Sequence, residues 1–328
     1  MVSADFHVAA QPVRLITAGW PEPRGKSLIE KWQSAQSAQQ DLRRLLMHEP
    51  RGHADMCGVL LTASERDDSD AGLLFMHHGG FPTMNGQGVV AAARHLAEQS
   101  GDQARFVTFD TPAGQVRCRV HWSKGPDGPR VQRVSFASVP SFVLAAGVPV
   151  AIGNRVLNVD VAFSGVFHAI VDAESAGLAV TLDKLPELRA AGATIAKAIE
   201  KELSVVHPAS PELSGLDGVV FTAPPTSEIS GLRSVTVFAD QAIDRSPCGT
   251  GTCALVAVLD AMGLVDSEQP FVHEGLLSTT FSGAVVERTT VGEIPAVVVE
   301  VSGSAFRTGA HTFVLESNDP FPKGYRLT

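Results

Sequence analysis

Two segments of this 328-residue chain resemble each other in sequence and in the order of the elements that they predict. Residues 58–63 (GVLLTA) match residues 218–223 (GVVFTA), and residues 85–88 (NGQG) match residues 248–251 (CGTG), at offsets of 160 and 163 residues. Each copy runs from an apolar strand through a polar tip and a second strand to an x-G-x-G turn and a helix rich in Ala and Val. The repeat therefore predicts two similar halves.

The order of the predicted elements indicates an α+β fold. We expect an N-terminal half at 1–140, which includes the first glycine-rich helix start at Asn85, and a C-terminal half at 141–310, which includes the second at Cys248. A C-terminal strand at 311–328 is expected to complete the N-terminal half. The strongest helical patterns cover 28–46, 89–96, 182–203 and 254–262.

The composition is that of an ordinary soluble globular protein, with 44% hydrophobic and 19% charged residues. The formal net charge of −9 argues against a nucleic-acid binder. No apolar run approaches the roughly 20 residues that a membrane helix needs, and the N-terminal sequence lacks the pattern of a secretory signal. By default we expect a cytoplasmic protein that binds a small molecule, and neither a nucleic acid nor a membrane.

A thiol lies in the second glycine-rich turn. Residues 244–254 (DRSPCGTGTCA) follow the strand-like run 234–239 and precede a helical run, so Cys248 is expected beside the first N–H groups of a helix. Such a position binds anions and lowers the pKa of a thiol. Gly249 and Gly251 let the backbone approach a ligand closely. The alternative is a buried structural cysteine in a glycine-rich turn.

The two turns favour a compact anion over a nucleotide or a metal. Neither turn has a complete GxGxxG or a Walker lysine. The four cysteines, Cys57, Cys118, Cys248 and Cys253, have no zinc-type spacing. If the two helix starts face each other across one cleft, their positive ends together would hold a small carboxylate.

A thiol beside a bound α-carboxylate suggests abstraction of a Cα proton. This chemistry needs a base at contact distance, fixed donors for the enolate-like charge, and exclusion of water. The amides of two helix starts supply the donors. Asp244 either pairs with a substrate ammonium group or caps its own turn.

Three segments of the sequence resemble a known family. The segment around Cys248, residues 49–56 (EPRGHADM) and residues 308–325 (TGAHTFVLESNDPFPKGY) are similar to the proline racemase family, and the similarity extends from about Thr17 to the C-terminus. That family includes proline racemases, 4-hydroxyproline 2-epimerases and trans-3-hydroxy-L-proline dehydratases. The resemblance implies two pseudo-symmetric halves, each a β-sheet wrapped around a central helix as in diaminopimelate epimerase. It also implies an active site in the cleft between them, no metal or organic cofactor, and a monomer or homodimer.

The same resemblance implies roles for individual residues. Cys248 matches the second catalytic thiol, and Gly249 and Thr250 match backbone donors to the substrate carboxylate. Asp244 matches the contact to the ring nitrogen, and Phe238 matches an aromatic wall of the pocket. In the first motif, Gly86 and Gln87 occupy the positions of the other carboxylate-binding amides.

The N-terminal half departs from the family pattern at several positions. Asn85 occupies the first catalytic position, where the family carries Cys or sometimes Ser, and an amide cannot act as a base near neutral pH. Gln87 replaces a histidine that helps to hold the substrate amine. Cys57 occupies a position where an aromatic wall residue is common. Dehydratases of the family combine one Cys with a non-thiol partner, but they keep the first Cys and not the second.

Three functions remain open from the sequence. The first is a hydroxyproline dehydratase in which Cys248 is the single base and Asn85 binds a ring hydroxyl or a water. The second is a 4-hydroxyproline or proline epimerase, in which a water or a residue outside the motif supplies the other proton. The third is a non-catalytic protein that binds an imino acid.

Overall fold

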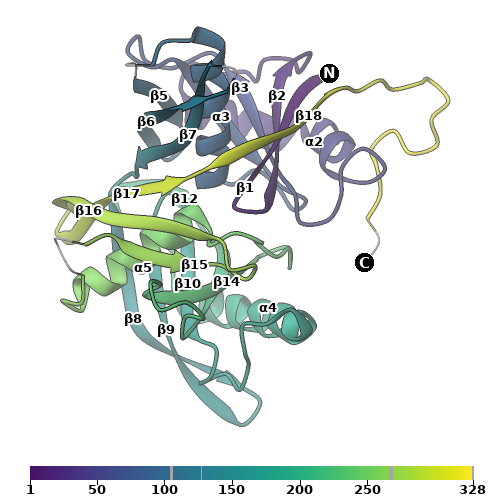
Figure 1. Cartoon of the computed structure of the whole chain (residues 1–328). Coiled ribbons are helices and arrows are strands. Elements are labelled where there is room, and N and C mark those ends of the chain that lie inside the picture. The colour runs from purple at the N-terminus through teal and green to yellow at the C-terminus, as the bar shows by residue number, and fades with distance from the viewer. Residues whose placement is uncertain (104–105, 127, 266–268, 327–328) are drawn as a thin grey trace. The chain divides into compact units, whose positions relative to one another are not determined.

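The computed structural model divides the chain into two units (Figure 1). Unit 1 comprises Met1–Phe136 and Ser304–Thr328, and unit 2 comprises Ala137–Gly303. Both units combine strands and helices, so the predicted α+β class is confirmed. The residues that the structure describes are 1–103, 106–126, 128–265 and 269–326.

The strands of unit 2 form a closed barrel. Their order is β16-β15-β14-β13-β10-β9-β8-β17, and pairing of β16 with β17 closes the ring. The pairs β10–β13 and β14–β15 are parallel, and the other pairs of the ring are antiparallel. The barrel strands are β8 (Ser141–Ile152), β9 (Arg155–Phe163), β10 (Phe167–Asp172), β13 (Leu216–Ala223), β14 (Leu232–Phe238), β15 (Phe271–Glu274), β16 (Thr280–Val291) and β17 (Ile294–Gly303). A separate hairpin joins β11 (Val206–His207) to β12 (Ser210–Ser214).

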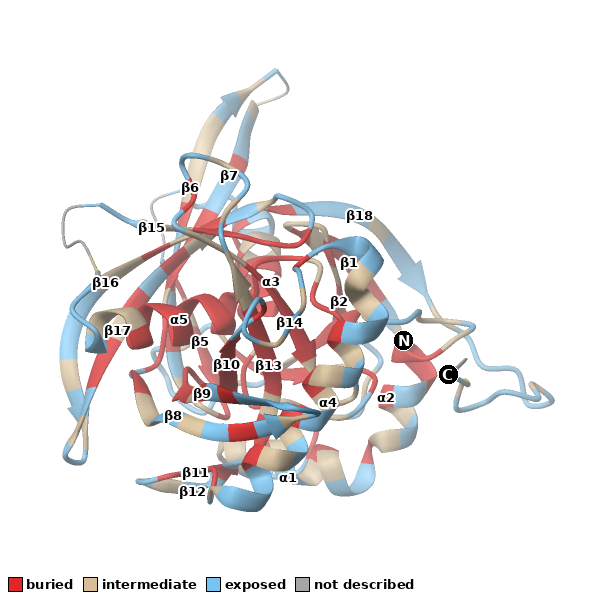
Figure 2. Ribbon diagram, turned by 90° about the horizontal axis from the view of Figure 1, so that it is seen from below, coloured by how far each residue is buried: buried red, intermediate tan, exposed pale blue. Residues whose placement is uncertain are grey.

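Helix α5 (Gly249–Ala261) is the core of this barrel. It packs against β8, β9, β10, β16 and β17, and every residue from Gly249 to Val258 is buried. Figure 2 shows the helix mostly in the colour of buried residues. A helix that is apolar on all sides needs such an enclosed position. The start of α5 is therefore fixed by the strands around it.

Helix α4 (Leu185–Glu202) has one buried face. A 3₁₀ turn, η1 (Leu182–Lys184), leads into it. Its buried residues recur every three or four positions, and it packs on β13 and β14. Figure 2 shows the remaining face as exposed or half-buried. The buried stripe consists of Leu188, Gly192, Ile195 and Ile199.

Unit 1 contains a second set of eight paired strands among the described residues, in the order β7-β6-β5-β4-β3-β2-β1-β18. The pairs β2–β3 and β4–β5 are parallel, and β1–β2, β3–β4 and β5–β6 are antiparallel. This is the alternation seen from β9 to β16 in unit 2. The strands are β1 (Val2–Val8), β2 (Gln11–Ala18), β3 (Cys57–Thr62), β4 (Ala71–Met76), β5 (Phe106–Thr111), β6 (Gly114–Gly125), β7 (Gly128–Ala137) and β18 (Ala305–Thr312).

Helix α3 (Gly86–Ser100) lies between β4 and β5 in sequence, as α5 lies between β14 and β15. It packs against β1, β2, β3 and β18, and its first turns are buried. Helices α1 (Leu28–Ala38) and α2 (Gln40–Met47) connect β2 to β3. The repeat in the sequence thus corresponds to two helices that follow equivalent hairpins.

Two predictions of secondary structure were wrong. A strand was expected at 311–328, but β18 ends at Thr312. The following residues up to 326 include turns with Pro and Gly, which do not continue a strand. Residues 327–328 lie outside the described residues. The helix expected at 28–46 is interrupted at Gln39. The side chain of Gln39 accepts a hydrogen bond from Trp20 Nε1 at 2.8 Å and donates one to Pro21 O at 2.9 Å, and these contacts fix the break.

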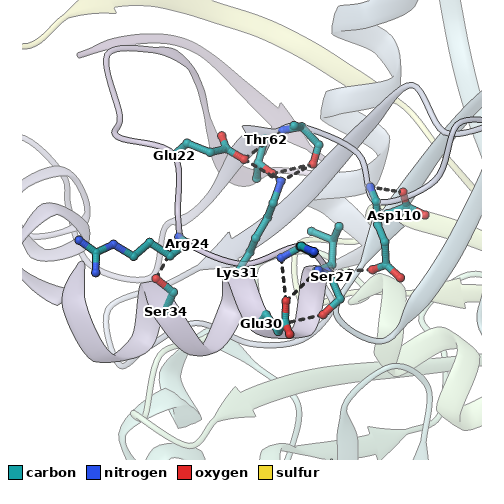
Figure 3. A network of polar contacts seen from close by, with 12 residues as sticks. Glu22, Arg24, Ser27, Glu30, Lys31, Ser34, Thr62 and Asp110 are labelled. Carbon is teal, nitrogen blue, oxygen red and sulfur yellow. Dashed lines mark hydrogen bonds and ion pairs between the residues drawn. The ribbon is translucent and has the colours of Figure 1, made fainter.

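A buried lysine anchors α1 in unit 1 (Figure 3). Lys31 Nζ donates hydrogen bonds to Glu22 Oε1 at 2.7 Å, Thr62 Oγ1 at 3.0 Å and Ala63 O at 2.7 Å. The helix itself starts with a capping box formed by Ser27 and Glu30. The cation therefore ties α1 to the end of β3, because a buried charge is stable only when it is fully paired.

A carboxylate on β5 binds the loop between β3 and β4 through hydrogen bonds. Asp110 is completely buried and accepts hydrogen bonds from the backbone N–H groups of Glu65 and Arg66 at 2.8 and 2.9 Å. The Ser69 hydroxyl and the Arg66 guanidinium also donate to it, at 3.0 and 2.5 Å. The strand that follows α3 is thereby joined to the hairpin that precedes it.

Unit 2 has the same arrangement. Glu274 on β15 accepts hydrogen bonds from the backbone N–H groups of Thr226 and Ser227, at 2.9 and 3.3 Å. Arg233 Nη1 donates to it at 2.9 Å, and the Thr226 hydroxyl also donates to it. A buried acid therefore clamps the β13–β14 loop beside α5, as Asp110 clamps the loop beside α3.

Asp110→Asn is expected to destabilise the protein near neutral pH. Burial alone would raise the pKa of Asp110, but hydrogen bonds from Arg66, Glu65 and Ser69 outweigh burial and lower it below its ordinary value of 3.8. The stabilisation is thus fully present above about pH 4 and is lost as the pH falls through the lowered pKa. Urea unfolding at pH 7 should show a loss of about 1–3 kcal/mol.

The matched control is Asp67→Asn, which changes an exposed acid in the same loop. It should leave the free energy of unfolding within about 0.5 kcal/mol of the parent value. The loss in Asp110→Asn should also shrink in acid. An equal loss in both variants, or a loss that persists unchanged at pH 2, would contradict this account.

Candidate active site

Cys248 is the N-cap residue of α5 and has a strained backbone. Its φ of 63° and ψ of 117° lie outside the regions that side chains other than Gly normally adopt. Its Sγ accepts a hydrogen bond from Gly251 N at 3.2 Å, so the sulfur caps the helix. Strain of this kind costs about 1–3 kcal/mol and concentrates at functional sites.

A chain of buried side chains holds this conformation. The Thr252 hydroxyl donates to the carbonyl oxygen of Cys248 at 2.8 Å, and His273 Nδ1 lies 2.8 Å from the same hydroxyl. Since Thr252 already donates its proton, His273 Nδ1–H must be the donor to Thr252, and Nε2 accepts from the Ser234 hydroxyl at 2.8 Å. Burial lowers the pKa of His273 to about 3, so the ring is neutral.

A second chain of side chains reaches the sulfur itself. Thr250 Oγ1 lies 3.4 Å from Cys248 Sγ, and His168 Nε2 lies 3.0 Å from Thr250 Oγ1. Ser164 Oγ donates to the Thr250 carbonyl at 2.9 Å. His168 is completely buried in β10, and this burial lowers its pKa to about 4.

The expectation of a lowered thiol pKa at the helix start was wrong. Burial of Cys248, followed by the charge of Asp244, raises its pKa well above the ordinary value of 9, although the Thr250 hydroxyl and the Gly251 amide act in the opposite direction. Asp244 is itself buried, and its Oδ1 accepts from the N–H and hydroxyl of Ser246 at 2.8 and 2.7 Å. The sulfur is therefore a thiol at neutral pH.

Asn85 is the N-cap of α3 in unit 1, as Cys248 is of α5. Its Oδ1 accepts from Gly88 N at 2.7 Å, and its φ of −152° is ordinary extended backbone. Cys57 on β3 approaches the same oxygen, with 3.9 Å between its Sγ and Asn85 Oδ1, and also donates to Pro12 O at 3.4 Å. Gly86 and Gln87 follow Asn85 in the first turn of the helix and are buried.

The other predicted site residues of unit 2 lie on one continuous segment. Phe238 ends β14 and is half-buried, and its N–H donates to Ala242 O at 2.9 Å in the turn that leads to Asp244. Gly249 and Thr250 form the first turn of α5 beside Cys248. The residues predicted for unit 2 therefore lie between the end of β14 and the first turn of α5.

Sequence reasoning missed the polar residues beneath this turn. A histidine inside an apolar strand (FHAIV) was a visible signal for His168, whereas Thr252 and His273 had none. Thr236 was also missed: within the described part of the chain its buried hydroxyl has no hydrogen-bond partner. A Cβ placed on Gly251 would lie 3.5 Å from Thr236 Oγ1 and 3.2 Å from Cys248 Sγ, so the two groups flank one position.

Among the residues that the structure describes, the remaining thiols and acids form no metal site. Burial raises the pKa of Cys118 and, to about 12, that of Cys253. Among the described residues, no group of three or more His, Cys, Asp and Glu side chains is arranged to hold a metal ion. In the same residues, no helix combines the length and apolarity needed to cross a membrane.

Gly88→Ala is expected to disturb the start of α3. A Cβ at this position would lie 2.6 Å from Val59 Cγ2 and 3.0 Å from Phe75 Cδ1, so the helix start or the sheet must shift. Thermal or urea unfolding should show a loss of about 1–3 kcal/mol. The control is Gly80→Ala in the preceding turn, where a Cβ meets nothing within 4 Å. Similar stability of the two variants would mean that Gly88 is not a packing requirement.

The chain is similar to known proteins over nearly its whole length. The family model described as "Proline racemase" matches residues 3–326. A trans-3-hydroxy-L-proline dehydratase of Bacillus cereus is 39% identical over 98% of this chain and 97% of its own length. A proline racemase of Acetoanaerobium sticklandii is 32% identical over 98% of this chain and 97% of its own length.

Solved structures show the same relationship. A hydroxyproline epimerase of Agrobacterium vitis, with bound trans-4-hydroxy-L-proline, superimposes with a TM-score of 0.93 at 27% identity, over 100% of this chain and 94% of that one. Both the sequence and the fold are thus shared over nearly the full length. The chain belongs to the proline racemase family.

Proposed function

We propose that the protein is a cofactor-independent hydroxyproline dehydratase that uses Cys248 as its single thiol base. The observation that carries this proposal is the difference between the two N-cap residues. Cys248 caps α5 with a sulfur, whereas Asn85 caps α3 with an amide, which cannot take up a proton. Elimination of a β-hydroxyl after α-proton abstraction needs one base, whereas racemisation by two opposed bases needs two.

The residues of unit 2 fit the steps of this reaction. We assign the N–H groups of Gly249 and Thr250 to the substrate carboxylate, Asp244 to the ring ammonium, and Phe238 to the ring face. The Cys248 thiolate takes the Cα proton, and the C–H electron pair forms the Cα–Cβ double bond as the Cβ–O bond breaks. The hydroxide leaves as water with a proton from the new thiol, and the enamine tautomerises to a cyclic imine.

The position of the thiol also bears on stereochemistry. The family resemblance implies that dehydratases keep the thiol of the first motif. This chain instead keeps the thiol of the second motif, Cys248. If the two helix starts face each other across one substrate, as the family resemblance implies, a base at the second start removes the proton from the opposite face of Cα. The substrate is therefore a 3-hydroxyproline whose Cα hydrogen faces Cys248, with the Cα configuration opposite to that used by an enzyme with the first thiol.

The test is incubation of the protein with all four 3-hydroxyproline isomers in deuterated water. We expect imine formation from isomers of one Cα configuration, and at least a 10³-fold loss in Cys248→Ala, because the base is removed. The control is Cys253→Ala, which removes another buried thiol from the same helix. The activity of this variant should stay within about threefold of that of the parent protein. Absence of turnover with every isomer would refute the proposal.

A second function, epimerisation of hydroxyproline or proline, is favoured by one contact. Cys57 Sγ lies 3.9 Å from Asn85 Oδ1, so a thiol is adjacent to the first catalytic position although the motif itself lacks one. If Cys57 supplies the second proton, Cα deuterium will appear in both stereoisomers of 4-hydroxyproline and Cys57→Ala will stop it. If the protein is a dehydratase, exchange will be confined to one configuration, and Asn85→Cys is the variant that should gain racemisation.

We also propose that the two units are pseudo-symmetric copies of one diaminopimelate epimerase-like unit. The same alternation of parallel and antiparallel pairs supports this, as do the equivalent N-caps Asn85 and Cys248 and the equivalent clamps Asp110 and Glu274.

A further inference from the structure

The buried thiol of Cys248 needs an acceptor for its proton. Its side chain is 1% exposed, and the base required by the proposed reaction is the thiolate. The hydroxyl of Thr250 contacts the sulfur at 3.4 Å, and His168 Nε2 contacts that hydroxyl at 3.0 Å. All three groups lie in unit 2 and all are buried. They form an unbroken path from the sulfur into the barrel.

His168 is neutral, because burial lowers its pKa to about 4, so one of its ring nitrogens is unprotonated. The neutral ring has one N–H. Its Nδ1 is buried and has no hydrogen-bond partner among the described residues. The backbone of Gly218, the residue paired with His168 across β10 and β13, raises the pKa of the ring, but burial lowers it more. We assign the ring proton to Nδ1, because Nε2, 3.0 Å from Thr250 Oγ1, is then the acceptor that the relay needs.

We propose that Thr250 and His168 form a relay that converts Cys248 from thiol to thiolate. This inference rests on the proposed function of Cys248 as a base. The S–H bond breaks as the Thr250 oxygen takes the proton, and the original O–H bond breaks as Nε2 takes the second proton. The result is a thiolate, an unchanged hydroxyl and an imidazolium. No proton enters from solvent, and no electron is transferred.

Two carboxylates oppose a thiolate that has no cation beside it. Asp244, in the turn before α5, and Asp217, which precedes Gly218 on β13, both raise the pKa of Cys248. An imidazolium two hydrogen bonds from the sulfur supplies an opposite charge, which favours the ionised thiol. His273, the other buried histidine beside the turn, forms hydrogen bonds with Thr252 and Ser234. These bonds lead to the Cys248 carbonyl and not to the sulfur. His168 is thus a positioning residue that acts through Thr250.

The experiment measures thiolate formation at Cys248 directly. Absorbance at 240 nm is followed against pH in the full-length protein, with Cys248→Ala as the background, and Cα deuterium exchange is measured in parallel. His168→Gln keeps a hydrogen-bonding side chain but cannot accept the proton. Thr250→Val removes the hydroxyl, and Thr250→Ser restores it.

We expect the apparent thiol pKa to rise by at least about one unit in His168→Gln and Thr250→Val, with exchange at pH 7 falling at least about tenfold in kcat and little change in KM. Thr250→Ser should return the thiol pKa to the parent value and recover most of the exchange that is lost in Thr250→Val. The matched control is His273→Gln, which removes an equally buried histidine from the backbone side of the turn. It is expected to lower stability, because it breaks the bonds to Thr252 and Ser234, and to shift the thiol pKa less than His168→Gln does, because His273 does not contact the sulfur.

Several results would overturn the relay. One is an unchanged thiol pKa in His168→Gln; another is an equal shift in His273→Gln; a third is failure of Thr250→Ser to restore the titration. The proposed function fails separately, if the parent protein exchanges no Cα proton from any proline derivative. In that case the titration at 240 nm still decides the relay, because it needs no substrate.

Discussion

The hydrogen bond from Thr252 to the Cys248 carbonyl is the interaction on which the site depends. It holds a non-glycine residue at a φ of 63°, and it is oriented by His273, which is oriented by Ser234. These residues belong to α5, β15 and β14, so three elements of the barrel determine one backbone conformation. Because α5 is enclosed on all sides, the strain at its first residue cannot relax by movement of the helix.

Burial and the helix dipole act against each other at this sulfur. The N-terminus of a helix favours a thiolate, but the loss of water and the nearby Asp244 disfavour it more strongly. A dry site strengthens every interaction with a substrate charge, yet it leaves the base protonated at rest. A proton acceptor beside the thiol allows the site to be dry and the base to be ionised during the reaction. This role explains why the apolar part of β10 contains His168.

The sequence was sufficient to predict the two helix starts and the α+β class, because glycine turns and apolar periodicity are local signals. Cys248, Thr250 and Asp244 could be found because they share one short segment. His168 and His273 could not be connected to them, since these residues reach the turn from distant strands and their roles follow from tertiary contacts alone. The sign of the thiol pKa shift was also out of reach, because burial of Cys248 depends on the closed barrel. The end of β18 was misjudged because an edge strand with exposed residues has little alternation to mark it.

The sulfur of Cys248 is at once a reactive atom and part of a helix terminus. As a thiolate it accepts the Gly251 N–H as a charge-assisted hydrogen bond, which is stronger than the bond that a thiol accepts. The first turn of α5 is therefore held most tightly when the base is ready and loosens once the sulfur has taken a proton. The protonation state of the Cys248 sulfur therefore affects the rate of amide hydrogen exchange in the first turn of α5.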